Sequence, residues 1–146
     1  MSERCVLFAG GATLPRPRAS WRAALVPRRG LGVRSGALAT VEDFLALDAR
    51  VGTIVSAQVL RGARKPAFTL KIDFGELGTR TSSAQISELY ETEDLVGLQV
   101  VAVVNLPPKR VAGLQSEVLV LAVGDGRGAN VLLIPERPVP DGGRVS

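Results

Sequence analysis

Two neighbouring segments of the chain alternate along their length with a period of two, which is typical of β-strands. In residues 50–60 the odd-numbered positions are predicted to share one face: Val51, Thr53, Val55, Ala57 and Val59. In residues 67–75 the even-numbered positions are large and apolar: Phe68, Leu70, Ile72 and Phe74. We therefore predict two strands, joined by the turn RGARKP, and a core-facing side on the second strand.

A short helix is predicted immediately before the first strand. Thr40 is suited to the N-cap, and Asp43 follows three residues later, as in a capping box. The helix would present Phe44, Leu45 and Leu47, whose apolar side chains need burial. So short a helix is marginal alone, and a closed barrel cannot easily cover it. We therefore predict that these three residues form a dimer interface.

The rest of the chain adds one more helix and several strands to the pattern. Residues 79–84 fit a short polar strand, and residues 84–95 are the only other helical candidate. Three further segments are apolar on both faces and are predicted as strands: 97–106, 116–124 and 129–136. The order is helix, three strands, helix, then two or three strands, without an alternating βαβ rhythm.

This order predicts an all-β fold of the OB type. Such a fold is a five-stranded Greek-key barrel, here with a short N-terminal helix and a helix between strands 3 and 4. A β-sandwich is the rival architecture, although it usually lacks the intervening helix. OB barrels bind ligands on one barrel face and in their loops, so polar residues at strand ends become the candidates for a site.

Residues 1–39 differ from the rest and are predicted to be a disordered basic extension of a domain that covers residues 40–146. Residues 1–40 hold seven arginines and one acidic residue, whereas residues 41–146 hold eleven basic and thirteen acidic residues. Three origins fit the extension: a targeting peptide, an RNA-binding arm or, slightly favoured, a misassigned start codon. Any nucleic-acid site on the domain must therefore be a local cluster of charge.

The composition excludes several kinds of chemistry. The 146 residues include no histidine and a single cysteine, Cys5. A disulfide framework within one chain, a zinc site built on His and Cys, and a Ser-His-Asp or Cys-His catalytic pair are thereby excluded. We predict no catalytic residues, no metal site and no cofactor. No stretch reaches the roughly 18 apolar residues of a membrane span.

A polar insert separates two of the apolar strands and opens with Pro107-Pro108. The prolines stiffen the loop that carries Lys109 and Arg110. This stiffness reduces the entropy lost when these basic side chains bind a phosphate. The alternative is a pair of solvated charges. We predict contact with RNA phosphate, and we include Ser116, at the end of the insert, among the candidate RNA ligands.

Polar side chains also end the third predicted strand. Ser82, Ser83 and Gln85 could hydrogen-bond to ribose hydroxyls and base edges. Alternatively, one of the two serines caps the helix that is predicted to begin near Ala84. Both roles are compatible, because a helix N-terminus also attracts phosphate.

Further bases flank the first strand, namely Arg50, Arg64 and Lys65, and we count them as RNA-binding candidates. Few aromatic residues remain for base stacking, which favours a shape- and phosphate-reading mode on folded RNA.

Asn105 is predicted to satisfy backbone groups where a strand ends. Glu117 would repel phosphate, so we expect it to pair with a cation or with backbone amides.

Three runs of sequence together resemble the tRNA-binding domain family: FGELGTRTSSAQIS, VVNLPPKRVAGLQSEVLVLA and VLLIPERPVPDGGRV. The similarity extends from about Val41 to the C-terminus. Within this family the chain most resembles the CsaA group of export-related bacterial chaperones. Two departures from the wider family, at Ala63–Ala67 and at Ser116–Leu119, agree with that group.

The resemblance implies an OB barrel with an added N-terminal helix, a homodimer, and tRNA recognition largely by shape. It leads to the hypothesis of a non-enzymatic, cytoplasmic, homodimeric protein that binds tRNA or other structured RNA. The alternative is a chaperone for unfolded or pre-export polypeptides, with an apolar groove at the dimer seam. Organellar targeting by residues 1–39 is a further option for localisation.

Overall fold

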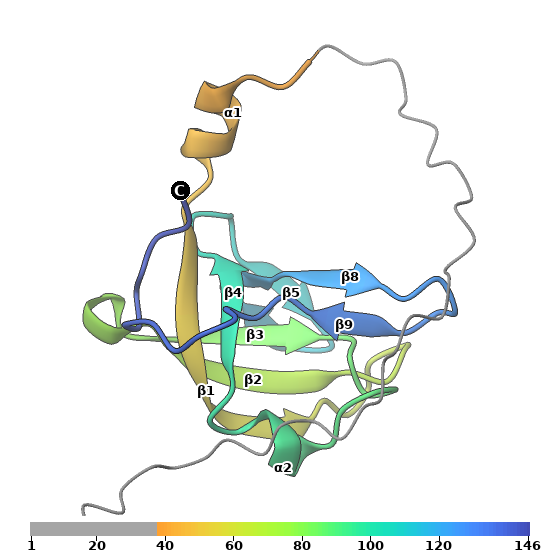
Figure 1. Cartoon of the computed structure of the whole chain (residues 1–146). Coiled ribbons are helices and arrows are strands. Elements are labelled where there is room, and N and C mark those ends of the chain that lie inside the picture. Colours follow the sequence, from red (N-terminus) through yellow and green to blue (C-terminus); the bar gives the residue numbers. More distant parts are fainter. Residues whose placement is uncertain (1–37) are drawn as a thin grey trace, which may run out of the picture. The chain divides into compact units, whose positions relative to one another are not determined.

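The computed structural model of the protein describes residues 38–146. Residues 1–37, which make up almost all of the predicted basic extension, lie outside the described part of the chain. The described residues are mostly β-structure with a few short helices (Figure 1).

Five antiparallel strands form the main sheet, in the spatial order β3-β2-β1-β4-β7. Their bounds are β1 (Ala49–Val59), β2 (Phe68–Asp73), β3 (Thr79–Ala84), β4 (Gln99–Val103) and β7 (Leu119–Val120). The sheet curls until its two outer strands, β3 and β7, approach one another. This nearly closed barrel confirms the fold class that the sequence predicts.

The two outer strands meet along a seam that side chains help to close. One backbone bond crosses it, from the amide of Glu117 to the carbonyl of Thr81 at 2.8 Å. In return, the Glu117 carboxylate accepts from the Thr81 amide at 2.8 Å. The Ser82 hydroxyl donates to the carbonyl of Val118 at 2.9 Å. The seam therefore depends on side-chain acceptors and donors where other strand pairs use a backbone ladder.

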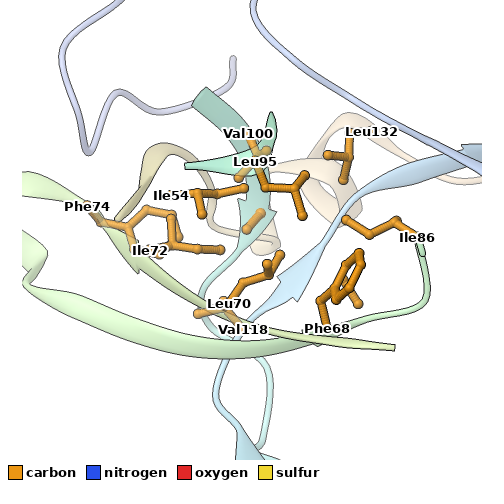
Figure 2. Close-up of a cluster of buried hydrophobic side chains, with 12 residues drawn as sticks. Ile54, Phe68, Leu70, Ile72, Phe74, Ile86, Leu95, Val100, Val118 and Leu132 are labelled. Carbon is orange, nitrogen blue, oxygen red and sulfur yellow. The ribbon is translucent and has the colours of Figure 1, made fainter. Parts of the chain in front are cut away.

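The core lies inside the barrel and includes the apolar side of β2. Phe68, Leu70 and Ile72 of β2 and Phe74, which directly follows it, are all buried, as the alternation predicts. Figure 2 shows them converging with side chains from other elements. These partners are Ile54, Ile86, Leu95, Val100, Val118 and Leu132.

The shared face predicted for β1 is wrong beyond its middle. Ile54 pairs with Ile72 and Ser56 with Lys71, so Val55 is an extra residue in a β-bulge. A bulge changes the phase of the alternation, because two residues of one strand oppose one of the other. Ile54 before the bulge and Ala57 after it accordingly both pack in the core, whereas Val55 is 48% exposed.

Gly52 lets β1 pack closely against β2. A Cβ atom at this position would lie 2.7 Å from both Ile72 Cγ2 and Phe74 Cδ1. Real Cβ atoms do not approach their neighbours so closely. The absence of a side chain is therefore required by packing, since the backbone of Gly52 occupies the space beside two core residues.

Helix α1 (Val41–Ala46) has the predicted capping box, with Thr40 at the N-cap. It is tethered to the barrel through Asn105, whose amide accepts from the Asp48 backbone and donates to the Ala46 carbonyl, both at 2.8 Å. The predicted structural role of Asn105 is thus confirmed. From the C-terminal segment, Arg144 donates to the carbonyl of Leu45 at 2.9 Å.

The second predicted helix is much shorter than expected. Residues 84–95 fit a helical pattern, but α2 covers only Thr92–Leu95. Ala84 still belongs to β3, where it pairs with Phe68 of β2, and Ile86 enters the core. No helix therefore begins near Ala84, and the predicted serine cap does not exist there. A 3-10 turn, η1 (Gly75–Leu77), links β2 to β3.

The C-terminal third contains more and shorter strands than predicted. The insert itself forms a hairpin of β5 (Lys109–Val111) and β6 (Leu114–Ser116). The long apolar segment 116–124 divides into β7 and β8 (Ala122–Gly124). Strand β8 pairs with β9 (Asn130–Leu132) in a second hairpin.

Candidate nucleic-acid interface

The hairpin β5–β6 presents the two bases of the insert. Its turn is formed by Ala112 and Gly113, whose φ angles are 48° and 82°. Two consecutive positive φ values are typical of the type I′ turn that closes a two-residue hairpin. The predicted loop is therefore wrong in detail, because Lys109 and Arg110 lie on a paired strand directly after the prolines. Pairing with Ser116 and Gln115 fixes their backbone.

A groove of about 1060 Å³ runs beside this hairpin and over the seam of the barrel. In the described part of the chain, its lining comes mainly from the β1–β2 turn, the end of β3, the hairpin, and the segment from Ser116 to Ala122. Asn130 and Leu132, the two ends of β9, complete its lining. The groove thus combines segments that lie far apart in the sequence.

Among the described residues, four cations line the groove, and all four are among the predicted RNA ligands: Arg64, Lys65, Lys109 and Arg110. Their side chains are exposed. None of them belongs to the ion pairs formed within residues 38–146. Their positive charge is therefore available to an anion, in a domain whose total charge is slightly negative.

Three predicted polar ligands lie in the same groove. Ser83 and Gln85 come from the end of β3 and from the residues that follow it, and Ser116 comes from the end of β6. The Ser116 hydroxyl accepts from the Ser83 amide at 3.1 Å, which holds the two sides of the groove together, and it donates to the carbonyl of Val118 at 3.3 Å. It can therefore offer a ligand only its remaining lone pair. Hydroxyl and amide groups placed beside cations can hydrogen-bond to ribose and base edges.

Ser82 does not fit the predicted role. Its side chain is fully buried, and its hydroxyl donates a hydrogen bond to the carbonyl of Val118. In β3, alternate side chains face opposite sides of the sheet, so Ser82 points into the barrel while Ser83 points toward the groove. We therefore exclude Ser82 from the candidate interface.

Arg50 is also excluded from the candidate interface. Its guanidinium pairs with the Asp48 carboxylate at 2.6 Å and donates to the carbonyl of Gly142 at 2.9 Å. It does not line the groove. It instead attaches the C-terminal segment to the start of β1, a structural role that its position in the sequence did not indicate.

Within residues 38–146, Glu117 is the only carboxylate that lines the groove. Besides accepting from the Thr81 amide, it lies 3.7 Å from the guanidinium of Arg80. These contacts confirm the prediction that Glu117 bonds a backbone amide and pairs with a base. Its negative charge is directed to the seam and is partly balanced there.

The floor of the groove is apolar, which the charge pattern did not predict. It is formed by Ala84, Ile86, Val118, Leu119, Val120 and Leu132. Such a floor beside charged walls can accommodate the ring faces of nucleobases or the side chains of an extended peptide. The geometry is therefore compatible with both predicted ligand classes.

The family model described as "Putative tRNA binding domain" matches residues 49–144. The chain belongs to this tRNA-binding domain family. The resemblance inferred from the sequence is therefore confirmed, and the match spans every residue that lines the groove.

Solved structures of this family share the fold. The CsaA chaperone of Bacillus anthracis str. Ames is 55% identical with a TM-score of 0.72, and the alignment covers 75% of this chain and all of that one. The CsaA chaperone of Picrophilus torridus is 42% identical with a TM-score of 0.70 and the same coverage. Both likenesses therefore extend to the sequence as well as to the fold.

Curated relatives of the tRNA-binding domain include a methionine–tRNA ligase from Methanococcoides burtonii. It is 40% identical over 105 residues, or 72% of this chain. A methionine–tRNA ligase from Porphyromonas gingivalis is 39% identical over 104 residues. This chain spans only 15% of the length of either ligase.

The structure also bears on metal ligands and on membrane-spanning helices in this chain. Within residues 38–146, no three His, Cys, Asp or Glu side chains gather closely enough to hold a metal ion. In the same range no helix is long and apolar enough to cross a membrane.

The β8–β9 turn, whose flanking residue Asn130 lines the groove, is held by Asp125. Its carboxylate accepts from the backbone amides of Arg127 at 2.7 Å and Ala129 at 3.0 Å. The bond from Arg127, opposed in part by desolvation and reinforced by the bond from Ala129, lowers the pKa of Asp125. Neither Asp125 nor Asn130 carried a sequence signal that could have placed it near the groove.

Proposed function

We propose that this chain is a binding protein for folded RNA, with tRNA as its main ligand, and that it has no catalytic activity of its own. The groove over the barrel seam would hold the RNA backbone. The family membership and the methionine–tRNA ligase relatives support tRNA as the ligand class.

One observation carries the proposal: four cations without ion-pair partners in the described chain line one groove. Two come from the β1–β2 turn and two from the β5–β6 hairpin, on segments about 45 residues apart. Surface cations are usually scattered or held in ion pairs. Phosphate contacts instead need several basic side chains on one face that are free of ion pairs.

The test is filter binding of bulk tRNA at several salt concentrations. The double variant Lys109→Ala/Arg110→Ala should bind less tightly, and its slope of log affinity against log salt should be shallower. Loss of two phosphate contacts predicts a change of about 1.8 for a duplex-like surface, or about 1.4 for a single strand. A chain beginning at Thr40 separates the groove from the arginine-rich residues before it.

The matched control removes two cations from outside the groove. Lys71 and Arg137 are exposed and do not line it. Lys71→Ala/Arg137→Ala changes the net charge by the same amount and should leave the salt slope near that of the parent chain. Equal changes in the two double variants would show that binding follows net charge, and would refute a localised site.

We further propose that the chain is a homodimer joined through α1. Phe44 and Leu45 of α1 and Leu47, the residue at its C-cap, are 46%, 50% and 44% exposed in the single chain, which is unusual for three large apolar residues so close together. Phe44→Asp should therefore give a monomer by light scattering. An unchanged dimer mass would rule out α1 as the interface.

A second candidate function is the binding of unfolded polypeptide, in the same groove. The likeness to CsaA chaperones and the apolar floor of the groove favour it. The protein should then suppress aggregation of a denatured client, and tRNA should compete with that effect. Suppression that tRNA leaves unchanged would place the polypeptide elsewhere, and no suppression at several-fold molar excess would exclude this function.

A further inference from the structure

A second, smaller hollow of about 310 Å³ adjoins one end of the groove. Lys65, Gln85 and Asn130 line both spaces, so the hollow is continuous with the groove. Ser87 and Glu88 line only the hollow. Its volume is at the lower end of the range for small-ligand sites, so it suits one small ring system, whereas the groove can hold a longer segment.

The wall of the hollow is fixed by a hydrogen bond between two distant elements. The side-chain amide of Asn130, at the start of β9, donates to the backbone carbonyl of Gln85 at 2.9 Å. This bond joins the β8–β9 hairpin to the residues that follow β3. The amide oxygen of Asn130 accepts no hydrogen bond from the described residues, so it remains available to a ligand.

The other polar side chains around the hollow also have hydrogen-bonding groups that no described residue uses. Within residues 38–146, the side chains of Gln85, Ser87 and Glu88 form no hydrogen bond. Lys65 and Glu88 line the same space, yet no ion pair joins them. A small hollow surrounded by polar groups that do not satisfy one another is suited to a polar ligand.

We propose that this hollow binds a single unpaired nucleobase that carries an amine on its pairing edge, such as cytosine. The inference rests on the proposed function, because the groove must first hold the adjacent RNA backbone. Unpaired bases are the part of an RNA that proteins read on the pairing edge, and carboxylates accept from the N4 amine of cytosine.

Glu88 makes the hollow selective. The amides of Gln85 and Asn130 and the hydroxyl of Ser87 can each donate or accept, so they can adapt to either pyrimidine. An ionised carboxylate can only accept. Cytosine offers it an amine, whereas uracil presents a carbonyl oxygen at the same ring position and would be repelled. Lys65 is placed to bind the phosphate of the same nucleotide.

The experiment uses the full chain and two RNA stem–loops that differ only in a loop of four cytosines or four uracils. Because the stems are identical, binding by the basic N-terminal residues and by the groove cancels in the ratio of the two affinities. The parent chain should bind the cytosine loop about tenfold more tightly. Glu88→Gln should bring the ratio close to one, because glutamine can donate as well as accept.

Glu91→Gln is the matched control, since Glu91 is exposed, lies three residues away and does not line the hollow. It removes the same charge and should strengthen binding of both RNAs equally, leaving the tenfold ratio intact. A ratio of one in the parent chain, or a ratio that Glu88→Gln does not change, would overturn the base-reading hollow. Failure of the parent chain to bind either RNA at low salt would instead overturn the proposed function itself.

Discussion

Glu117 should have opposite effects on stability and on RNA affinity, because the same carboxylate fastens the barrel seam and repels phosphate. Its bond with the Thr81 amide is 2.8 Å long, and its side chain is 35% exposed. Charge-assisted hydrogen bonds contribute about 1.5–3 kcal/mol, and the partial exposure places this one near the lower limit. The ion pair with Arg80, at 3.7 Å between half-exposed groups, adds little.

Two substitutions separate the hydrogen bond from the charge. Glu117→Ala removes the acceptor and should reduce the free energy of unfolding by about 1.5 kcal/mol, or roughly 6 °C in Tm for a domain of this size. Glu117→Gln keeps an oxygen acceptor, so it should reduce Tm by only about 2 °C. Thermal denaturation followed by circular dichroism measures both. Equal losses in the two variants would refute the assignment of stability to this bond.

The affinity should change in the other direction. A phosphate about 8 Å from the carboxylate in a watery groove is repelled by about 0.5 kcal/mol, which corresponds to roughly twofold in affinity. Glu117→Gln should therefore bind tRNA about twofold more tightly at low salt, and the gain should vanish at high salt. Glu136→Gln, at an exposed position outside the groove, is the control. Weaker binding by Glu117→Gln would show that phosphate does not enter the groove.

Three further predictions concern local structure and are measured by denaturation or by amide exchange. Gly52→Ala should lose about 1–3 kcal/mol by overpacking, whereas Gly124→Ala, where nothing lies within 4 Å, should be close to neutral; similar losses would refute the packing argument. Ala112→Asn should gain about 0.5 kcal/mol, because asparagine tolerates the φ of 48° in a type I′ turn. The backbone and side-chain bonds of Thr40 lower the pKa of Asp43, so the contribution of the helix cap is complete above the unfolded value of about 3.9 and is lost as the pH falls through the lower folded value. Protection of the α1 amides, measured against the exchange rate of an unstructured peptide at the same pH, should therefore decrease below about pH 4, and Asp43→Asn should remove that dependence.

The sequence predicts the second strand of this barrel well because its alternation is uninterrupted. Phe68 to Phe74 keep one phase through β2, and all four expected core residues are buried. The first strand has an equally clear pattern, but the bulge at Val55 shifts it. A bulge is decided by how a strand pairs with its neighbour, so a pattern read along one segment does not contain it.

The predicted helix over residues 84–95 failed for a related reason. Its spacing of apolar residues suits a helix, yet Ala84 extends the ladder with β2 and Ile86 packs in the core. Tertiary contacts override a modest local preference for helix. The hairpin that carries Lys109 was missed because it has few apolar residues and its turn contains an alanine where asparagine or glycine is usual.

The sequence predicted most residues of the candidate site, but it did not predict where in the fold they come together. Charge and polarity selected the bases and hydroxyls that line the groove, but the same criteria also selected Arg50, which pairs with Asp48, and Ser82, which is buried. Which polar residues are consumed by the fold depends on contacts between segments far apart in the chain. Those contacts become visible only once the barrel is assembled.

The way in which the barrel is closed has a consequence for its internal motion. A backbone ladder opens cooperatively, whereas the seam beside the groove relies on a few side-chain bonds around a single backbone bond. Segments with few such bonds open at a lower free energy than the rest of a domain. The amides of Thr81 and Ser83 should therefore exchange with solvent sooner than those between β1 and β2. A ligand that contacts both sides of the groove would bridge the seam and stabilise it. Ligand binding should therefore slow the exchange of these two amides.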